Sequence, residues 1–98
     1  MKVTVEKRIE RILSSFSQTE RARIDRVVEL FTDKGFLLSQ IYLKKLSKTV
    51  WELRPGRVRL LFGIIDDEAI IVNVFLKKTQ RTPLKEVKLA ERRLTEYL

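Results

Sequence analysis

The hydrophobic pattern of the chain changes from a helical period to a period of two and back, and this change limits the folds open to it. Between residues 50 and 77, three runs with a period of two are separated only by Pro55-Gly56 and Asp66-Asp67-Glu68. Such runs predict β-strands, and connections this short require neighbouring strands to be antiparallel. The predicted strands are Val50–Arg54, Arg57–Ile65 and Ala69–Lys77.

Two helices are predicted ahead of these strands. Apolar residues recur every three or four positions from Val5 to Phe16 and again from Ile24 to Phe31, which is the spacing of one helix face. Ser17 and Glu20 stand three residues apart between the two series, as in a capping box at the start of a helix. Gly35 follows the second series and supplies the left-handed residue that ends a helix.

The remaining segments complete an α+β fold, which we expect to form one domain over residues 1–98. Lys2–Val5 alternates and predicts a short strand, whereas Ser39–Lys48 is irregular and basic. Thr82-Pro83 is typical of a helix start. The final helix, from Leu84 to about Tyr97, would direct inward Leu84, Val87, Ala90, Leu94 and Tyr97. The expected architecture is two N-terminal helices, a three- to four-stranded antiparallel sheet and a C-terminal helix.

The composition removes several classes of function. The 98 residues include neither Cys nor His, which excludes disulfides, thiol nucleophiles, zinc-finger and iron–sulfur sites, and Ser-His-Asp catalysis. The longest uncharged apolar run, Ala69–Leu76, is far shorter than the ~20 residues of a membrane-spanning helix. With 21 Lys and Arg against 13 Asp and Glu, the net charge is +8. We therefore expect a soluble, cytoplasmic, basic protein that uses no cofactor or metal and binds no membrane.

The positive charge is concentrated in two blocks. Residues 41–65 hold six basic side chains and one acidic one, and residues 77–98 hold seven basic and three acidic ones. The acidic residues between the blocks, Asp66-Asp67-Glu68, are consecutive and predict a turn rather than a metal site. If the two blocks converge on one face, they form a surface for a polyanion; if they do not, they are ordinary solvated charge.

The alternation along the strands indicates that the charges do converge. Successive side chains point to opposite faces, so one face of the predicted sheet would carry Glu52, Arg54, Arg57, Arg59, Asn73, Phe75 and Lys77. A tight Pro55-Gly56 hairpin would set Arg54 opposite Arg57 and Glu52 opposite Arg59. A turn centred on Asp67 would set Arg59 opposite Phe75 and Arg57 opposite Lys77.

Guanidinium groups around a phenyl ring can bind a phosphate while a base stacks on the ring. The simpler alternative is a half-exposed sheet with a wet face. The charge on this face favours binding, because it combines four cationic groups with one carboxylate and an exposed Phe75. Trp51 shares the apolar set with Leu53 and is expected in the core.

Two long motifs resemble a known family. The first is W-E-L-R-P-G-R-V-R from Trp51 to Arg59, and the second is F-L-K-K-T-Q-R-T-P from Phe75 to Pro83. Together with the helical pair and the basic segment Lys44-Lys45-Leu46, they resemble the HigB-like, phage-derived branch of the RelE/ParE toxin superfamily. The resemblance implies a type II toxin that cleaves mRNA on the ribosome without a metal. It also implies neutralisation by a cognate antitoxin, often a helix-turn-helix repressor.

The resemblance also implies roles for particular residues. It sets Arg59 against the scissile phosphate, matches Glu52 and Arg54 to charged positions of the preceding strand, and matches Lys77 and Lys78 to the basic pair after the last strand. We expect catalysis to depend on Arg59, Arg54, Glu52 and Lys77, with Glu52 orienting or accepting the 2′ proton. The expected RNA-binding residues are Arg57, Phe75, Lys78, Lys44, Lys45, Arg81 and Lys85.

One departure from the family leaves other functions open. Relatives often place a His or Tyr near the start of the C-terminal helix for proton transfer, whereas this chain has Leu84, Lys85 and Glu86 there. The departure favours a non-catalytic inhibitor that binds a topoisomerase, as in the ParE branch. A plain RNA-binding module without toxicity is a third possibility. The arginine-rich face and the second motif favour the nuclease.

Overall fold

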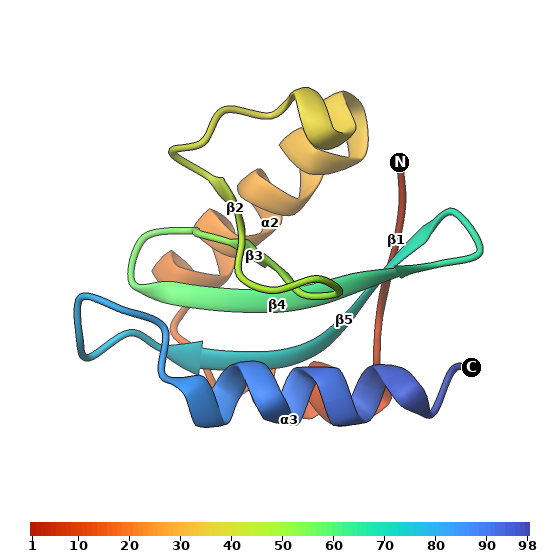
Figure 1. The fold of residues 1–98 in the computed structure, drawn as a ribbon. Helices are drawn as coiled ribbons and strands as arrows, with labels where there is room; N and C mark the ends of the chain where they lie inside the picture. Colours follow the sequence, from red (N-terminus) through yellow and green to blue (C-terminus); the bar gives the residue numbers. More distant parts are fainter.

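The three predicted strands form the centre of a larger sheet in the computed structural model, which describes residues 1–98 (Figure 1). Five strands lie in the order β1-β5-β4-β3-β2. Strand β1 is parallel to β5, and the other neighbouring pairs are antiparallel. Along the chain the elements are β1 (Lys2–Val5), α1 (Lys7–Leu13), α2 (Gln18–Lys34), the 3₁₀ helix η1 (Gly35–Leu37), β2 (Leu43–Lys45), β3 (Trp51–Leu53), β4 (Val58–Ile65), β5 (Glu68–Leu76) and α3 (Leu84–Thr95).

The α+β class is confirmed, but the sheet is larger than expected and is mixed rather than antiparallel. The predicted strand β1 is present, and it lies parallel to β5 at one edge of the sheet. Strand β2 is an addition at the other edge, inside the Ser39–Lys48 segment that was expected to be irregular. Only three residues of β2 pair with β3, which is too short a run to give an alternating pattern in the sequence.

The start of α2 forms as the sequence predicts. The Ser17 hydroxyl accepts a hydrogen bond from the Glu20 amide (3.2 Å), and the Glu20 carboxylate accepts one from the Ser17 amide (3.2 Å). Gly35, with φ of 57°, ends α2. Helix α1 is shorter than predicted and ends at Leu13. The hydroxyls of Ser14 and Ser15 bond to backbone carbonyls three residues earlier, a local alternative to further helix.

The acidic segment between β4 and β5 forms a two-residue turn. Asp66 and Asp67 both have positive φ (50° and 63°), as a hairpin turn of the I′ kind requires. Ile65 is paired with Glu68 across the turn. Farther along the hairpin the register shifts by one residue, because Leu61 pairs with Asn73 whereas Phe62 pairs with Ile71. Val72 is therefore left out of the pairing as a bulge.

The bulge corrects the predicted faces of β5. Uninterrupted alternation would place Val72 and Val74 on one face, whereas Val72 belongs to the core under α3 and Val74 to the core on the other side. One extra residue reverses the alternation of everything that follows it. Alternation counted back from Phe75 therefore assigns Ile70, Ile71 and Val72 to the wrong faces. Phe75 itself lies on the face predicted for it, on the same side as Leu61 and at the margin of the α3 core.

Both faces of the sheet are covered by helices. Helices α1 and α2 pack on one face around Ile9 and Phe31, and α3 packs on the other through Val87, Ala90 and Leu94. Figure 1 shows α2 and α3 on opposite sides of β4 and β5. The wet face expected from the sequence is thus partly buried. Gly63 permits this packing, because a Cβ there would lie 2.5 Å from Leu94 Cδ1 and 2.9 Å from the Thr49 carbonyl oxygen.

The ends of α3 differ from the prediction. Leu84 and Tyr97, expected to face inward, are exposed, because Leu84 is the first residue of the helix and Tyr97 follows its end. Pro83, rather than Thr82, is the N-cap residue. The Thr82 hydroxyl instead donates a hydrogen bond to the carboxylate of Glu52. No helix of the structure combines the length and the apolar character needed to cross a bilayer.

Candidate functional site

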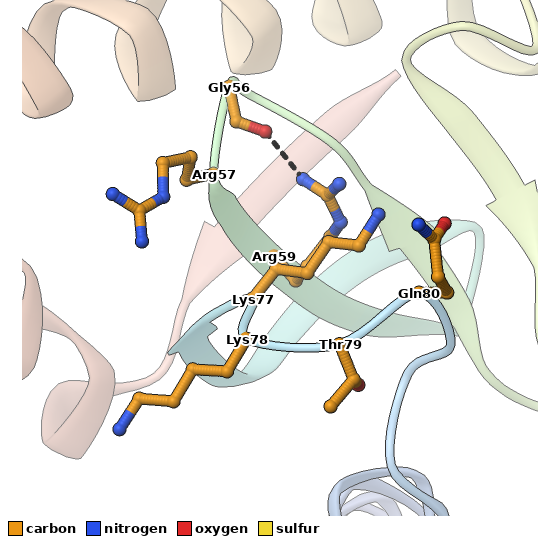
Figure 2. A pocket seen from close by; sticks show the side chains of 7 residues that line it. All are labelled: Gly56, Arg57, Arg59, Lys77, Lys78, Thr79 and Gln80. Atoms are coloured by element: carbon orange, nitrogen blue, oxygen red, sulfur yellow. Dashed lines mark hydrogen bonds between the residues drawn. The ribbon is translucent and has the colours of Figure 1, made fainter.

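An open hollow of about 550 Å³ lies where β4 begins and β5 ends, and no apolar side chain lines it. The lining residues are Gly56, Arg57, Arg59, Lys77, Lys78, Thr79 and Gln80 (Figure 2). Four of the seven carry a positive charge, and none carries a negative one. The two basic blocks of the sequence thus meet here, one block from the start of β4 and the other from the segment after β5.

Arg59 is the most tightly held of these cations. Its side chain is almost fully buried (6% exposed), and its Nη1 donates to the carbonyl oxygens of Gly56 (2.7 Å) and Val58 (2.9 Å). Figure 2 shows the bond to Gly56, with the side chains of Arg57 and Lys78 extending away from it. Because both hydrogen bonds use Nη1, Nη2 has no protein partner and is available to a ligand.

Burial lowers the pKa of Arg59 below that of a free arginine. The nearby Glu52 carboxylate raises that pKa, and the Arg54 guanidinium lowers it. An arginine remains protonated at neutral pH even so. Burial thus removes part of the hydration that stabilises the charged guanidinium, and an anion bound in the hollow would restore part of that stabilisation.

Glu52 is the buried counter-charge of the site. Its side chain is 1% exposed, and its Oε1 lies 3.5 Å from Arg54 Nε and 4.0 Å from Arg59 Nε. The other oxygen accepts the hydrogen bond from Thr82. This one carboxylate therefore connects β3, β4 and the segment that leads into α3.

The predicted register between β3 and β4 was wrong by two residues. Glu52 pairs with Leu61 rather than with Arg59, and Leu53 pairs with Leu60. Continued past the end of β3, this register sets Arg54 opposite Arg59 and not opposite Arg57. The loop around Pro55-Gly56 is wider than a two-residue turn, and the Arg59 side chain bonds inside it to the Gly56 carbonyl.

The predicted register between β4 and β5 is confirmed at this end of the hairpin. Arg59 pairs with Phe75, and the Lys77 amide donates to the Arg57 carbonyl (2.7 Å) in the next position. Asn73 shares this face but lies under α3, where its amide donates to the Glu86 carbonyl (3.1 Å). It therefore does not belong to the open surface on which the sequence placed it.

The other predicted RNA-binding residues line three neighbouring depressions. Lys44, Lys45 and Arg81 line a groove of about 860 Å³ that also reaches Leu84 and Val87 of α3. Thr79 lines both this groove and the hollow, so the two adjoin. Lys85 lines a groove with Phe75 and Lys78. Arg54 lines a depression that also includes Lys44, Lys45 and Trp51. The structure brings Arg57, Arg59, Lys77 and Lys78 into one hollow, with the remaining predicted residues around it.

Sequence reasoning missed the uncharged residues of the site. Gly56, Thr79 and Gln80 line the hollow, and Thr82 anchors Glu52. All four lie within the two long motifs, and this membership was the one feature of the sequence that could have identified them as site residues. Thr82 was interpreted as a helix cap because it precedes a proline, and nothing local to it indicates a bond to residue 52.

Chemically, the hollow can bind a phosphodiester and stabilise added negative charge. Arg59 and Lys77 are the donors, and the side chains of Arg57 and Lys78 extend away from Arg59 at the edge of the hollow. No carboxylate, imidazole or phenol lines the hollow, so no side chain in it is an obvious general acid or base. The structure contains no group of three or more acidic, His or Cys residues able to hold a metal.

Comparison with known proteins gives a family and a fold. Residues 11–95 match the family model described as "Phage derived protein Gp49-like (DUF891)". The structure is similar to a chain of the archaeal RelE–RelB complex from Pyrococcus horikoshii OT3, with a TM-score of 0.64 and 12% identity, over 79% of this chain and 94% of that one. It is also similar to a chain of the RelB–RelE antitoxin–toxin complex from Methanococcus jannaschii, with a TM-score of 0.58 and 16% identity, over 96% of each chain. No curated protein matched the sequence.

Proposed function

The chain belongs to the phage-derived Gp49-like family, and from this premise we propose that it is the toxin of a toxin–antitoxin pair and cleaves mRNA on the ribosome. The family match confirms the resemblance that the two motifs indicated, and the structural matches share the RelE fold. The proposed partners are a cognate antitoxin of the helix-turn-helix type that the resemblance implies, and the ribosome with its mRNA.

One observation carries the proposal of RNA cleavage: a polar hollow contains four cations, and the most buried of them, Arg59, is held rigidly with Nη2 free. In cleavage of RNA without a metal, the 2′ oxygen bonds to the adjacent phosphorus as its proton is lost to solvent. The bond from phosphorus to the 5′ oxygen of the next nucleotide breaks, that oxygen takes a proton from solvent, and a 2′,3′-cyclic phosphate remains. Negative charge grows on the phosphate oxygens during the attack. Donors fixed in advance at that position stabilise this charge without having to reorganise.

Arg59 and Lys77 are the proposed stabilisers of the charged phosphate, with Arg54 adding positive potential from behind. Lys78, Arg57 and the groove with Lys44, Lys45 and Arg81 would hold the RNA on either side. The groove with Lys85 brings Phe75 next to this path, where a base could stack. Because the hollow is open, the ribosome would have to orient the RNA in it.

Glu52 is the proposed positioning residue for Arg59. Two features argue against proton transfer by its carboxylate: it is 1% exposed, and it is already engaged by Arg54, Arg59 and Thr82. Ion pairing of this kind makes a carboxylate a weaker base. Of the two roles expected from the sequence, orientation is therefore better supported than acceptance of the 2′ proton.

The test is mRNA cleavage in cells after brief induction of the chain, mapped by primer extension. Arg59→Ala should abolish new transcript ends and restore growth. The control Arg21→Ala, at an exposed position of α2, should cut like the wild type. Full cleavage and full growth arrest by Arg59→Ala would refute the proposed role of the hollow.

A second candidate is a non-catalytic inhibitor that binds a topoisomerase. It is favoured by the lack of any acid or base among the residues that line the hollow. Growth arrest with intact transcripts and a loss of DNA supercoiling activity would support it over the nuclease. Absence of growth arrest altogether would point to a plain RNA-binding module.

A further inference from the structure

A patch of large apolar side chains is exposed between α2 and β2, away from the hollow. Leu37 in η1 is 91% exposed, Ile41 in the segment before β2 is 73% exposed, and Phe36, also in η1, is partly exposed (43%). Phe36 contacts the core rings of Phe31 and Phe62 along one side (ring centroids 5.6 and 6.4 Å apart), whereas Leu37 and Ile41 are not part of the core. We refer to Phe36, Leu37 and Ile41 as the η1 patch.

A depression of about 520 Å³ adjoins the η1 patch and shares Phe36 with it. Its apolar wall is formed by Phe36 and Trp51, whose ring centroids are 4.7 Å apart. Its charged side chains are Lys44, Lys45 and Arg54, and no acidic residue lines it. Lys45 Nζ lies 5.5 Å from the centroid of the Trp51 ring.

Strand β2 adds an open sheet edge to the same region. It is the last strand of the sheet, so only one of its sides is paired. Both of its lysines, Lys44 and Lys45, are exposed. Lysines on an edge strand disfavour pairing with a second copy of this basic chain, and they favour a partner with negative charge.

We propose that the η1 patch and the adjoining depression bind an acidic segment of the antitoxin, which places bulky apolar side chains against Phe36, Leu37 and Ile41. This inference rests on the proposed function, because it assigns the surface that the antitoxin uses. The three basic side chains of the depression are complementary to acidic residues beside those apolar anchors. RNA fits the patch poorly, since Leu37 and Ile41 offer neither a charge for phosphate nor a ring on which a base can stack.

Binding at this place would also interfere with the proposed RNA path. Lys44 and Lys45 line both the depression and the groove that adjoins the hollow. An acidic segment that pairs with these two lysines removes them from RNA binding, without touching Arg59. Neutralisation would then arise from competition for the lysines rather than from a blocked hollow.

The test uses the full chain and the antitoxin encoded beside its gene, with affinity measured by calorimetry. Leu37→Glu and Ile41→Glu each place a negative charge in the patch and should weaken the complex at least tenfold. Leu98→Glu is the matched control, because Leu98 is 90% exposed at the C-terminus; its affinity should equal that of the wild type. Thermal unfolding should be unchanged in all three variants, since the substituted side chains are exposed.

A second measurement separates this inference from the proposed function. Without antitoxin, Leu37→Glu should cleave mRNA like the wild type, and the antitoxin should no longer protect cells from it. If the wild-type chain binds the antitoxin and Leu37→Glu and Ile41→Glu bind it equally well, the inference is wrong and the proposed function stands. If Leu37→Glu loses cleavage but keeps its affinity for antitoxin, the patch serves the ribosome instead. If the wild-type chain binds no antitoxin, the proposed partner and this inference both fail.

Discussion

The two ends of the sheet face beneath α3 are built from the same strands yet have opposite character. At one end, Leu61, Gly63 and Val72 are covered by Ala90 and Leu94 of α3. At the other end, Arg57, Arg59 and Lys77 line an open, wholly polar hollow. Side-chain alternation in β4, and in β5 the bulge at Val72, place both sets on one face, so what separates them is how far α3 reaches along it. The covered end buries apolar side chains and stabilises the fold, whereas the open end keeps its cationic side chains accessible to a ligand.

Two arginines show the same contrast. Arg59 at the open end and Arg93 at the covered end both have a pKa that burial lowers. Both donate through Nη1 to backbone carbonyls; for Arg93 the acceptor is the carbonyl of Val72 (2.7 Å), the bulge residue that β4 leaves unpaired. Arg93 therefore completes the backbone bonding of the sheet, and its Nε is buried without a partner. Arg59 instead lines the hollow, and its Nη2 makes no hydrogen bond to the protein.

The largest stability effect is expected at the covered end. Leu94→Ala removes a buried side chain that packs over Gly63 and should lower the free energy of unfolding by about 2–5 kcal/mol. RNA affinity of the folded variant, measured below its unfolding transition, should match the wild type. A variant that loses RNA affinity while folded would show that the two ends are not independent. Urea unfolding and RNA titration provide both numbers.

The next largest loss of stability is expected when the hydrogen bond from Thr82 to Glu52 is removed. Thr82→Val keeps the shape but removes the hydroxyl that donates to a buried carboxylate, and should cost about 1.5–3 kcal/mol of stability. Unlike Leu94→Ala, it should also slow cleavage, because Glu52 positions Arg59. The control Thr82→Ser retains the hydroxyl and should restore most of both properties. Equal cleavage by Thr82→Val and the wild type would refute the positioning role.

A smaller change tests the close approach of α3. Gly63→Ala introduces a Cβ 2.5 Å from Leu94 Cδ1 and should destabilise the fold by about 1–3 kcal/mol through overpacking. Part of that cost should disappear in the double variant with Leu94→Ala, because the clash with the Leu94 side chain is then absent; the contact with the Thr49 carbonyl remains. Strictly additive losses of unfolding free energy would contradict this explanation of the glycine.

The smallest effect concerns one cation of the open end. Lys78→Ala removes an exposed side chain and should leave unfolding unchanged. Its RNA affinity should fall only a few-fold, and the slope of log affinity against log salt should decrease by about 0.7, as for one lost phosphate contact to a single strand. Lys88→Ala, on the exposed side of α3, is the control. An unchanged slope for Lys78→Ala would remove Lys78 from the RNA path.

Local chemistry explains which parts of this arrangement the sequence predicts. The Asp66-Asp67 turn is local and accounts for the Ile65–Glu68 pair, but its register continued along the hairpin would set Arg59 opposite Val74. The predicted Arg59–Phe75 pair forms because the bulge at Val72 shifts the register by one residue. The capping box at Ser17 is equally local. Pro55-Gly56 indicates a turn but not its width, so the partner of Glu52 was assigned two residues away from its actual place.

The features that sequence reasoning missed depend on contacts between distant segments. Neither Val72 nor Asn73 carries a bulge signal; the bulge is stabilised by Arg93, twenty-one positions away. Helix α3 can pack on the sheet because Gly63 leaves room for the Leu94 side chain. The hydroxyl of Thr82 donates to Glu52, thirty positions earlier in the chain. Alternation alone therefore predicted the arginine surface but could not limit it to one end of the face.

The most direct test of the account compares Arg59→Ala with Arg93→Ala in mRNA cleavage by the purified chain on programmed ribosomes. Removal of one donor to a developing phosphate charge costs roughly 100- to 1000-fold in rate, so Arg59→Ala should be slower by that factor at unchanged ribosome concentration. Arg93→Ala should lose stability yet cleave at nearly the wild-type rate while folded. Equal rates for the two variants, or undiminished cleavage by Arg59→Ala, would contradict the account.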